Sequence, residues 1–267
     1  MNKEFENYLK TKNLSPNTIK AYSFALRQFQ EEFHTVSHSH LCQYKLWLIE
    51  HYKPETVNLR IRAINCYLES IEKDNLKIPA VRLQQKNFLE NVISQADYTY
   101  FKSQLKQDNE MLWYFVVRFL AATGARISEL LQLKAEHIRI GYLDLYSKGG
   151  KLRRLYIPIR LQEEALEWMK AQNLQSGFIF LNQHGTRMTP RGISIQLKSL
   201  ALRYNINPAV VYPHSFRHLF AKTFLERFND IALLADLMGH ESIETTRIYL
   251  RKTSTEQHNI VNRVVDW

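Results

Sequence analysis

Residues 212–249 read YPHSFRHLFAKTFLERFNDIALLADLMGHESIETTRIY, and the rest of the chain is organised around them. Pro213 suits the first position of a helix, where an N–H has no partner within the helix. Between Leu219 and Leu237 apolar residues recur at helical spacing, with one interruption at residues 229–230. Gly239 fits the left-handed residue that ends a helix. The stretch is therefore predicted to form two consecutive helices and then a turn.

Four polar residues of this stretch favour chemistry on a phosphodiester. His214 and Arg217 are three residues apart, so a helix places them on one face. Ser242 can cap a further helix, and Tyr249 lies seven residues after it, two turns along. Arginine grips phosphate oxygens, histidine moves protons near neutral pH, and tyrosine offers a nucleophilic hydroxyl. With His240 in the turn, the set predicts attack on a phosphodiester that leaves a phosphotyrosine link.

Four short motifs carry a family resemblance. They are Thr-Gly-Ala-Arg-Ile-Ser-Glu-Leu at 123–130, Tyr-Pro-His-Ser-Phe-Arg-His at 212–218, Leu-Met-Gly-His at 237–240 and Thr-Thr-Arg-Ile-Tyr at 245–249. Their content and order resemble the catalytic region of the tyrosine recombinases, also called the phage integrase family, of the Xer-like or DNA-invertase-like kind. The resemblance is firm from Ala121 to Leu250 and looser before it.

The resemblance implies site-specific DNA recombination through a 3′-phosphotyrosyl intermediate and a Holliday junction. The implied catalytic residues are Arg126, Lys148, His214, Arg217, His240 and Tyr249. Tyr249 is the implied nucleophile, and Arg126 and Arg217 would hold the scissile phosphate. His214 would accept the tyrosine proton, and His240 would hydrogen-bond the phosphate. His218 is expected to pack and bond behind Arg217.

Residues 141–158 are predicted to form a β-hairpin, because apolar residues alternate and Gly149-Gly150 suits a tight turn. The apolar positions along it are Tyr142, Leu143, Leu145, Tyr146, Leu152, Leu155 and Ile157. By resemblance, Lys148 just before the turn would protonate the leaving 5′-oxygen. Lys151 stays open as the alternative, because hairpin register cannot be fixed from sequence.

The predicted fold is mainly α with a small antiparallel β-sheet, an α+β chain of two domains. Residues 1–80 would form an all-helical, SAM-like core-binding domain, 81–92 a linker, and 93–267 the catalytic domain. The expected helices cover 4–12, 18–33, 40–50, 54–73, two short pieces within 88–107, 111–122, 127–133, 161–171, 193–204 and 257–267. A short strand is expected at 178–181.

The charge of the chain points to a polyanionic partner. Its formal net charge is +10 and its pI is near 9.5, which favours nucleic acid. The candidate phosphate contacts are Lys20, Arg27, Arg60, Arg62 and Arg191, and further candidates are Lys86, Lys198 and Arg203. For each one alone, a solvated helix face is an equally good interpretation. We expect double-stranded DNA as the partner.

Other features indicate a cytoplasmic protein without cofactors. Cys42 and Cys66 are expected to be reduced core residues, and no secretory signal or membrane-spanning stretch stands out. His214 and His218 have a zinc-helix spacing, but Arg217 would bring its cation near the metal and converging carboxylates are missing. The covalent link would conserve the phosphodiester energy, so no ATP is expected, and the arginine and lysine charges would take the role of a metal.

The apolar stripe of the last predicted helix suggests subunit exchange. Its members are Ile260, Val261, Val264 and Val265. By resemblance, this helix would dock into a neighbouring subunit and link four protomers on DNA, with packing on its own domain as the alternative. The helical domain is expected to start at the first residues, without an arm-binding domain. A need for accessory proteins is left open.

Two other functions compete with recombination. A catalytically silent, sequence-specific DNA-binding protein could share the fold, although the intact Arg126, Arg217 and Tyr249 argue against it. A type IB topoisomerase would share the chemistry but usually has a longer chain. The DNA target, and the choice among integration, excision, inversion and dimer resolution, do not follow from the sequence.

Overall fold

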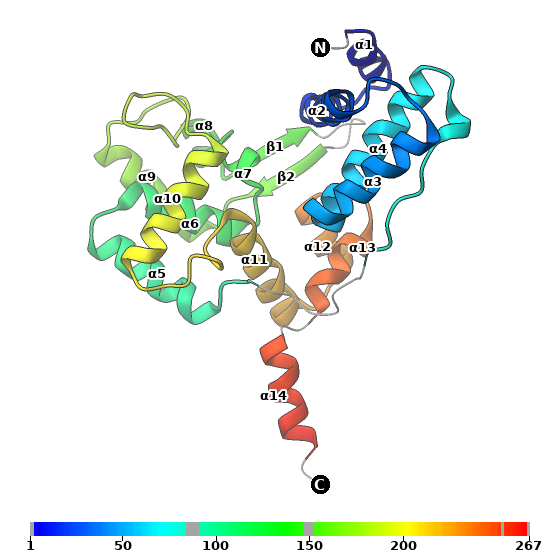
Figure 1. The fold of residues 1–267 in the computed structure, drawn as a ribbon. Coiled ribbons are helices and arrows are strands. Elements are labelled where there is room, and N and C mark those ends of the chain that lie inside the picture. The colour runs from blue at the N-terminus through cyan, green and yellow to red at the C-terminus, as the bar shows by residue number, and fades with distance from the viewer. Residues whose placement is uncertain (1–2, 84–90, 147–151, 252–253, 266–267) are drawn as a thin grey trace. The chain divides into compact units, whose positions relative to one another are not determined.

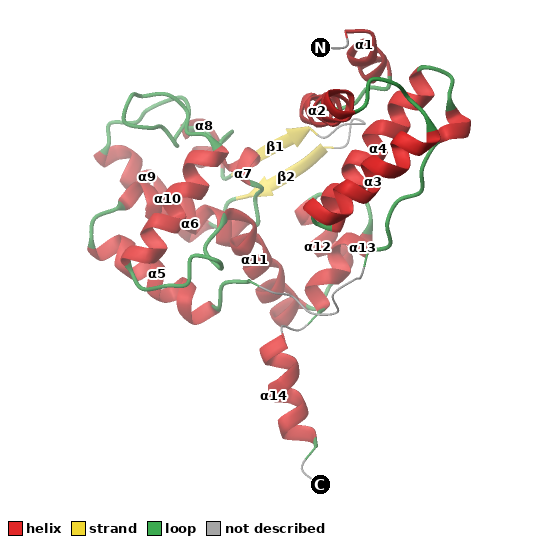
Figure 2. Cartoon of the chain, viewed as in Figure 1, coloured by secondary structure: helices red, strands yellow, loops and turns green. Residues whose placement is uncertain are grey.

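The computed structural model describes residues 3–83, 91–146, 152–251 and 254–265. It is mainly helical, with one two-stranded antiparallel sheet, as the sequence predicted (Figures 1 and 2). The chain divides into two compact units, residues 1–85 and 86–267. Within the described residues, no helix is long and apolar enough to cross a membrane.

The first unit is entirely helical in its described part. Its elements are α1 (Lys3–Thr11), α2 (Pro16–Glu32), α3 (His38–His51), α4 (Pro54–Ser70) and a 3-10 turn η1 (Asp74–Leu76). Ser15 caps α2 by accepting a hydrogen bond from the backbone N–H of Thr18, and Pro16 occupies the first turn. Ser37 caps α3 in the same way. Capping side chains thus set where these helices begin.

One apolar cluster holds the first unit together. It includes Phe5 of α1, Phe29 of α2, Leu41 of α3 and Ile64 of α4, all at most 2% exposed. The chain after η1 is pinned to this unit by two asparagines. The side chain of Asn58 bonds both the N–H and the carbonyl of Val81, and Asn65 does the same for Ile78. The stretch up to Val81 therefore belongs structurally to the first unit.

The second unit contains the remaining helices and the sheet. Its elements are α5 (Gln95–Gln107), α6 (Met111–Thr123), α7 (Ile127–Leu130), α8 (Ala135–Ile140), β1 (Tyr142–Tyr146), β2 (Leu152–Tyr156), α9 (Ile159–Ala171), α10 (Pro190–Arg203), α11 (Pro213–Phe228), α12 (Ile231–Met238), α13 (Ile243–Arg247), a 3-10 turn η2 (Ile248–Leu250) and α14 (Ser254–Val264). The two strands pair antiparallel, with Tyr142 opposite Tyr156 and Tyr146 opposite Leu152. This confirms the predicted hairpin.

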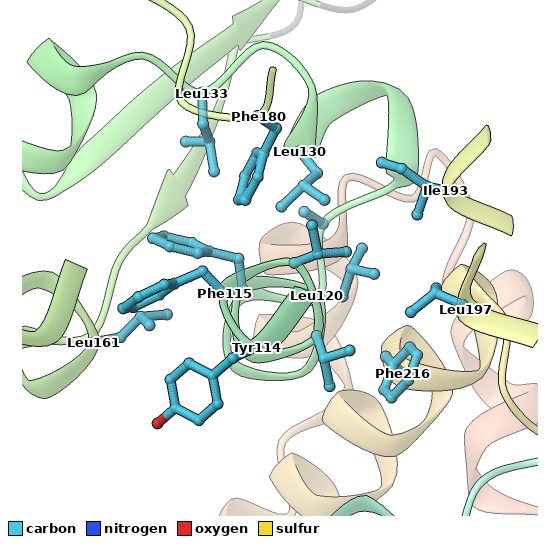
Figure 3. Close-up of a cluster of buried hydrophobic side chains, with 14 of the residues drawn as sticks. Tyr114, Phe115, Leu120, Leu130, Leu133, Leu161, Phe180, Ile193, Leu197 and Phe216 are labelled. Atoms are coloured by element: carbon cyan, nitrogen blue, oxygen red, sulfur yellow. The ribbon is translucent and has the colours of Figure 1, made fainter. Parts of the chain in front are cut away.

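The main core of the second unit surrounds α6. Figure 3 shows Phe115 and Leu120 of this helix among side chains of several other elements. These neighbours are Leu130, Leu133, Leu161, Phe180, Ile193, Leu197 and Phe216. Because Phe216 lies on α11, the packing of α11 on α6 fixes the helix that carries His214 and Arg217.

A smaller apolar cluster fixes the C-terminal end of the stretch 212–249. Leu225 of α11, Leu234 and Met238 of α12, and Tyr249 of η2 pack together and are at most 7% exposed. Gly239 ends α12 with a φ of 60°, a left-handed value that glycine adopts without strain. This cap turns the chain back, so that Tyr249 returns against α11.

Two local predictions were wrong, and one helix was not predicted. Residues 95–107 form the single helix α5, in which Asp97 lies in the first turn instead of at a break. Residues 178–181 make two isolated bridges, Phe178 to Lys134 and Leu181 to Arg187, and no strand. The sequence interpretation also missed α8, a short helix that ends at Gly141 with a φ of 80°.

Candidate active site

The structure brings five predicted site residues into one region of the second unit. Arg126 is the N-cap of α7, and His214 and Arg217 lie near the start of α11. His240 follows the glycine that ends α12, and Tyr249 lies in η2. The predicted Lys148 and its alternative Lys151 lie outside the described residues. Lys148 therefore stays a prediction.

Arg217 is the centre of this region. Its side chain is 1% exposed, and its guanidinium bonds the protein backbone at two places. Nη1 donates to the carbonyl of Gly124, and Nη2 donates to the carbonyl of Met238 at 2.7 Å. Burial, with the charges of Arg126 and Arg153, lowers the pKa of Arg217 to about 10, so it stays cationic at neutral pH. A buried cation held this way is preorganised to receive an anion.

Arg126 is held by a carboxylate three residues further on. Glu129 accepts hydrogen bonds from the backbone N–H of Arg126 at 2.7 Å and from its Nη1 at 2.8 Å. Nη2 of Arg126 reaches the carbonyl of Gly239 at 3.2 Å. Burial opposes ionisation of Glu129, but Arg153 and Arg126 outweigh it, so the pKa of Glu129 lies below its ordinary value. The ionised carboxylate fixes how Arg126 points.

The partners of His240 define its tautomer. Nη2 of Arg217 lies 3.0 Å from Nε2 of His240, and a guanidinium can only donate. Nε2 therefore accepts, and the ring proton sits on Nδ1, which lies 2.8 Å from Oγ1 of the fully buried Thr246. Burial, together with the charges of Arg217, Arg126 and Arg153, lowers the pKa of His240 to about 4. His240 is thus neutral in the free protein.

Tyr249 is buried beside two histidine rings. Its side chain is 5% exposed, and its ring centre lies 6.1 Å from that of His240 and 5.1 Å from that of His218. Burial raises the pKa of Tyr249, while Arg217 and Arg126 lower it in part. The hydroxyl is therefore protonated at neutral pH and needs a base before it can attack.

The two histidines of the α11 motif have different surroundings. The ring of His218 lies 6.0 Å from that of His214, and burial with nearby charges lowers the pKa of His218 to about 4. Nδ1 of His218 is buried without a hydrogen-bond partner among the described residues, so this atom does not make the predicted bond, and the ring packs against Tyr249. Burial and the charges of Arg217 and Arg126 also lower the pKa of His214. His214 is exposed and can exchange a proton with solvent.

Three residues of the region were missed by the sequence interpretation: Glu129, Arg153 and Thr246. Glu129 stands in the same motif as Arg126, three residues on, and that helical spacing was a usable signal. Arg153 occupies a buried position of β2, where an apolar residue is usual. Its burial follows only from the register of the hairpin, which the sequence does not fix. Thr246 resembles any capping or surface threonine in sequence.

The predicted DNA-contacting side chains of the first unit differ in their exposure and in their contacts within the unit. Lys20, Arg27 and Arg62 are exposed. Arg60 is half-buried, and its guanidinium lies 4.4 Å from the ring centre of Phe24 and bonds the carbonyl of Ala21 at 3.4 Å. Arg60 is thus largely committed within the unit.

On α10 of the second unit, Arg191 and Lys198 are exposed. Arg203 forms an ion pair with Glu110 at 2.8 Å, so its charge is already partnered. Lys86 lies outside the described residues.

The cysteines and possible metal ligands give few further constraints. Cys42 and Cys66 are free thiols, as expected, but both are only half-buried, and Cys66 packs at the edge of the core of the first unit. Among the described residues, no group of three or more histidine, cysteine or carboxylate side chains could hold a metal ion.

Comparison with known proteins gives a consistent result. The model of the phage integrase family matches residues 87–256. Tyrosine recombinase XerA of Pyrococcus furiosus is 29% identical over 272 residues, which cover 97% of this chain and 92% of the relative.

Two solved structures share the fold. The XerH site-specific recombinase bound to its difH substrate has a TM-score of 0.72 at 19% identity, covering 97% of this chain and 82% of that one. A lambda integrase tetramer bound to a Holliday junction has a TM-score of 0.73 at 16% identity, covering 94% and 77%. At these identities the likeness establishes the fold alone.

On this fold the buried Arg217 and the half-buried Arg126 both bond the turn before His240, and Tyr249 packs on the ring of that histidine. The chain belongs to the phage integrase family and is a site-specific tyrosine recombinase.

Proposed function

We propose that Tyr249 is the nucleophile that cleaves DNA, with Arg126 and Arg217 holding the scissile phosphate. This proposal is based on the contacts that Arg126, Arg217 and Tyr249 make with one turn, at residues 238–240. Arg126 bonds the carbonyl of Gly239, Arg217 bonds the carbonyl of Met238 and the ring of His240, and Tyr249 packs on that ring. Two cations and the tyrosine therefore converge on the same turn.

The reaction needs a base for Tyr249 and charge stabilisation for the phosphate. As the hydroxyl attacks, its proton passes to His214, and a 3′-phosphotyrosyl bond forms while the 5′-oxygen leaves. Arg126 and Arg217 stabilise the charge on the phosphoryl oxygens, a role worth several powers of ten in comparable sites. Lys148 donates the proton that the leaving 5′-oxygen needs.

His240 has to change its role when the phosphate arrives. In the free protein its Nε2 accepts from Arg217, but a phosphate oxygen needs a donor. We propose that the phosphate takes over the Nη2 donor of Arg217 and that His240 shifts its proton from Nδ1 to Nε2. The hydroxyl of Thr246 can support either tautomer, because it both donates and accepts.

The pH dependence of cleavage tests the role of His214. Because its pKa is lowered, the neutral, proton-accepting form persists below 6.5, the ordinary value for histidine. We expect the second-order rate constant for covalent complex formation, which reports the free enzyme, to stay level from pH 7.5 down to about 6.5 and to fall only at lower pH.

The matched variant for this test is His214→Gln. We expect it to react roughly 10²-fold more slowly, and its rate should not show the fall that the wild type shows below about pH 6.5. A wild-type profile that already declines above pH 6.5, or an unchanged decline in the variant, would assign the titration to another group.

Strand exchange follows from this chemistry. A 5′-hydroxyl from another strand attacks the phosphotyrosine, and two such rounds through a Holliday junction recombine two duplexes. We propose that the first unit serves as the core-binding domain and that Lys20, Arg27, Arg62 and Arg191 contact phosphates. Their exposure supports this, because phosphate contacts require free cations.

We propose that four protomers assemble on DNA through α14. The apolar side chains Ile260, Val261 and Val264 of this helix, and Val265 just after it, are 39–63% exposed, so the described part of their own chain leaves them largely uncovered. Lys222 of α11 forms an ion pair with Glu256, which supports a tether at the first turn of α14 and a free apolar stripe beyond it.

A charge placed on this stripe should prevent assembly. We expect Val264→Glu to abolish tetramers on a synthetic Holliday junction while half-site binding stays within about threefold, since charge is excluded from apolar interfaces. Analytical ultracentrifugation measures both. Asn259→Glu adds the same charge on the opposite side of α14 and should assemble normally. Equal loss in both variants would contradict the stripe as the interface.

Covalent trapping tests the proposed function as a whole. Duplex sites are first selected by the protein from a random-sequence pool, then nicked beside the candidate scissile phosphate so that cleavage releases a short fragment. A denaturing gel should show a covalent protein–DNA species, and mass spectrometry should locate the nucleotide on the tryptic peptide 248–251. DNA that is bound but never linked would favour the silent DNA-binding alternative.

A further inference from the structure

Arg153 is a buried arginine that the chemistry proposed above does not use. It lies on the inner face of β2 and is 8% exposed. Its Nη1 donates to both carboxylate oxygens of Glu129 at 2.7 Å, and its Nε donates to the carbonyl of Leu237 at 2.7 Å. One side chain therefore joins the hairpin to α7 and to the end of α12.

At one end, Arg153 and Arg126 share a single carboxylate. Glu129 accepts from the backbone and Nη1 of Arg126 as well as from Arg153. With these donors around it, the carboxylate cannot rotate freely. Since Glu129 also sets the direction of the Arg126 guanidinium, fixing the carboxylate fixes the arginine.

At the other end, Arg153 supports the turn that carries His240. The carbonyl of Leu237 lies three residues before His240, and the stem of Arg153 packs against Gly239. A Cβ built on Gly239 would lie 2.4 Å from Cδ of Arg153, so the glycine allows this close approach. The position of the turn thus depends directly on the arginine side chain.

Stability alone does not account for this arrangement. Nη2 of Arg153 is buried without a hydrogen-bond partner in the described parts of the chain, and an unmade hydrogen bond of a buried donor is unfavourable. A buried ion pair can often be replaced by apolar side chains without loss of stability. A local rule broken next to a reactive site indicates a functional requirement.

We propose that Arg153 is a positioning residue for DNA cleavage. Through Glu129 and the carbonyl of Leu237 it sets the separation between the guanidinium of Arg126 and the imidazole of His240, so that both reach the same phosphate. This inference rests on the proposed function of those two residues. It predicts a loss of rate at saturating DNA, with DNA affinity preserved.

The competing explanation is that Arg153 serves the hairpin tip and its general acid. Two substrates separate the two roles: the nicked site with its natural phosphodiester, and the same site with sulfur as the 5′-bridging atom. A thiolate leaves without protonation because thiols ionise near neutral pH. Sulfur therefore rescues a defect in the acid, but not a defect in phosphate positioning.

The experiment compares full-length variants in single-turnover trapping. We expect Arg153→Gln to react about 100-fold more slowly at saturation on both substrates, as when one preorganised donor is lost. Arg153→Lys should remain at least about 10-fold slower, because an ammonium keeps the charge but cannot bond Glu129 and Leu237 through separate nitrogens. Half-saturating DNA concentrations should stay within about threefold of wild type.

Arg118→Gln is the matched control. Arg118 is also a mostly buried arginine of the second unit, with one glutamate partner, Glu164, at 2.7 Å and one unpartnered buried nitrogen, Nε. Its variant loses a comparable ion pair away from the site and should cleave within about threefold of wild type. Circular dichroism confirms that each variant is folded under the assay conditions.

The outcomes separate this inference from the proposed function. If the wild type forms no covalent complex on DNA that it binds, the proposed function fails and the inference with it. If the wild type reacts and Arg153→Gln or Arg153→Lys matches it, the inference alone fails. Rescue of Arg153→Gln by the sulfur substrate, or an equal loss in Arg118→Gln, also overturns it.

Discussion

Tyr249→Phe is expected to eliminate the covalent protein–DNA complex and to leave DNA binding within about twofold of wild type. The substitution removes only the nucleophilic oxygen, and loss of a nucleophile costs roughly 10⁶-fold in comparable enzymes. The ring remains packed against Leu234 and Met238 in the small apolar cluster. Denaturing gels with a nicked substrate measure the first effect, and fluorescence anisotropy measures the second.

Tyr156→Phe is the matched control for this result. It removes the same atom from a side chain of the second unit that is 59% exposed. It should form the complex at the wild-type rate. Persistent covalent product in Tyr249→Phe would assign the nucleophile to another residue.

Arg217→Gln is expected to lose both activity and stability. The variant leaves the buried carbonyls of Gly124 and Met238 without their cationic donor, so the free energy of unfolding should fall by about 2–4 kcal/mol. It also removes a cation proposed to face the phosphate, so cleavage should slow by about 10³-fold. Urea denaturation and single-turnover trapping measure the two losses.

Two further variants make this result specific. Arg217→Lys should also be defective, because one ammonium cannot serve both carbonyls in the geometry of a guanidinium. Arg247→Gln removes an exposed arginine that pairs with Glu244 at 3.1 Å and should change the stability by less than about 0.5 kcal/mol. A fully stable Arg217→Gln would show that its backbone hydrogen bonds contribute little.

Much of the fold followed from local chemistry that the sequence displays. Ser15-Pro16 and Ser242 begin helices, and Gly239 ends one in a left-handed conformation, each at its predicted position. The hairpin followed from alternation around two glycines. These signals depend on a few neighbouring residues, so sequence alone was sufficient for them.

The errors arose where tertiary context decides. Leu152 was counted among the alternating apolar residues of the hairpin, yet it is 55% exposed, and Arg153 takes the buried face. An ion pair with Glu129 stabilises that register, and Glu129 lies 24 residues away in sequence. Residues 178–181 are apolar because Phe180 fills the core around α6, not because they pair as a strand.

The site residues were predicted mainly from the family resemblance of the motifs, and less from the spacing of the residues. The motifs identified Arg126, His214, Arg217, His240 and Tyr249, and the structure brings them to one region. Their supporting contacts join segments far apart in the chain. For example, the bond from Arg126 to Gly239 spans 113 residues, and no local pattern encodes it.

The bonds of Arg217 have a consequence for how tightly a bare phosphate can bind. Both hydrogens of its Nη2 already have acceptors, the carbonyl of Met238 and Nε2 of His240. A phosphate that binds at Nη2 must therefore compete with an internal acceptor, and the net gain at that atom is an exchange of one hydrogen bond for another. Millimolar inorganic phosphate should consequently be a poor inhibitor. Only DNA held by its many other contacts can supply the free energy that opens this internal bond, which couples reactivity to correct docking of the duplex.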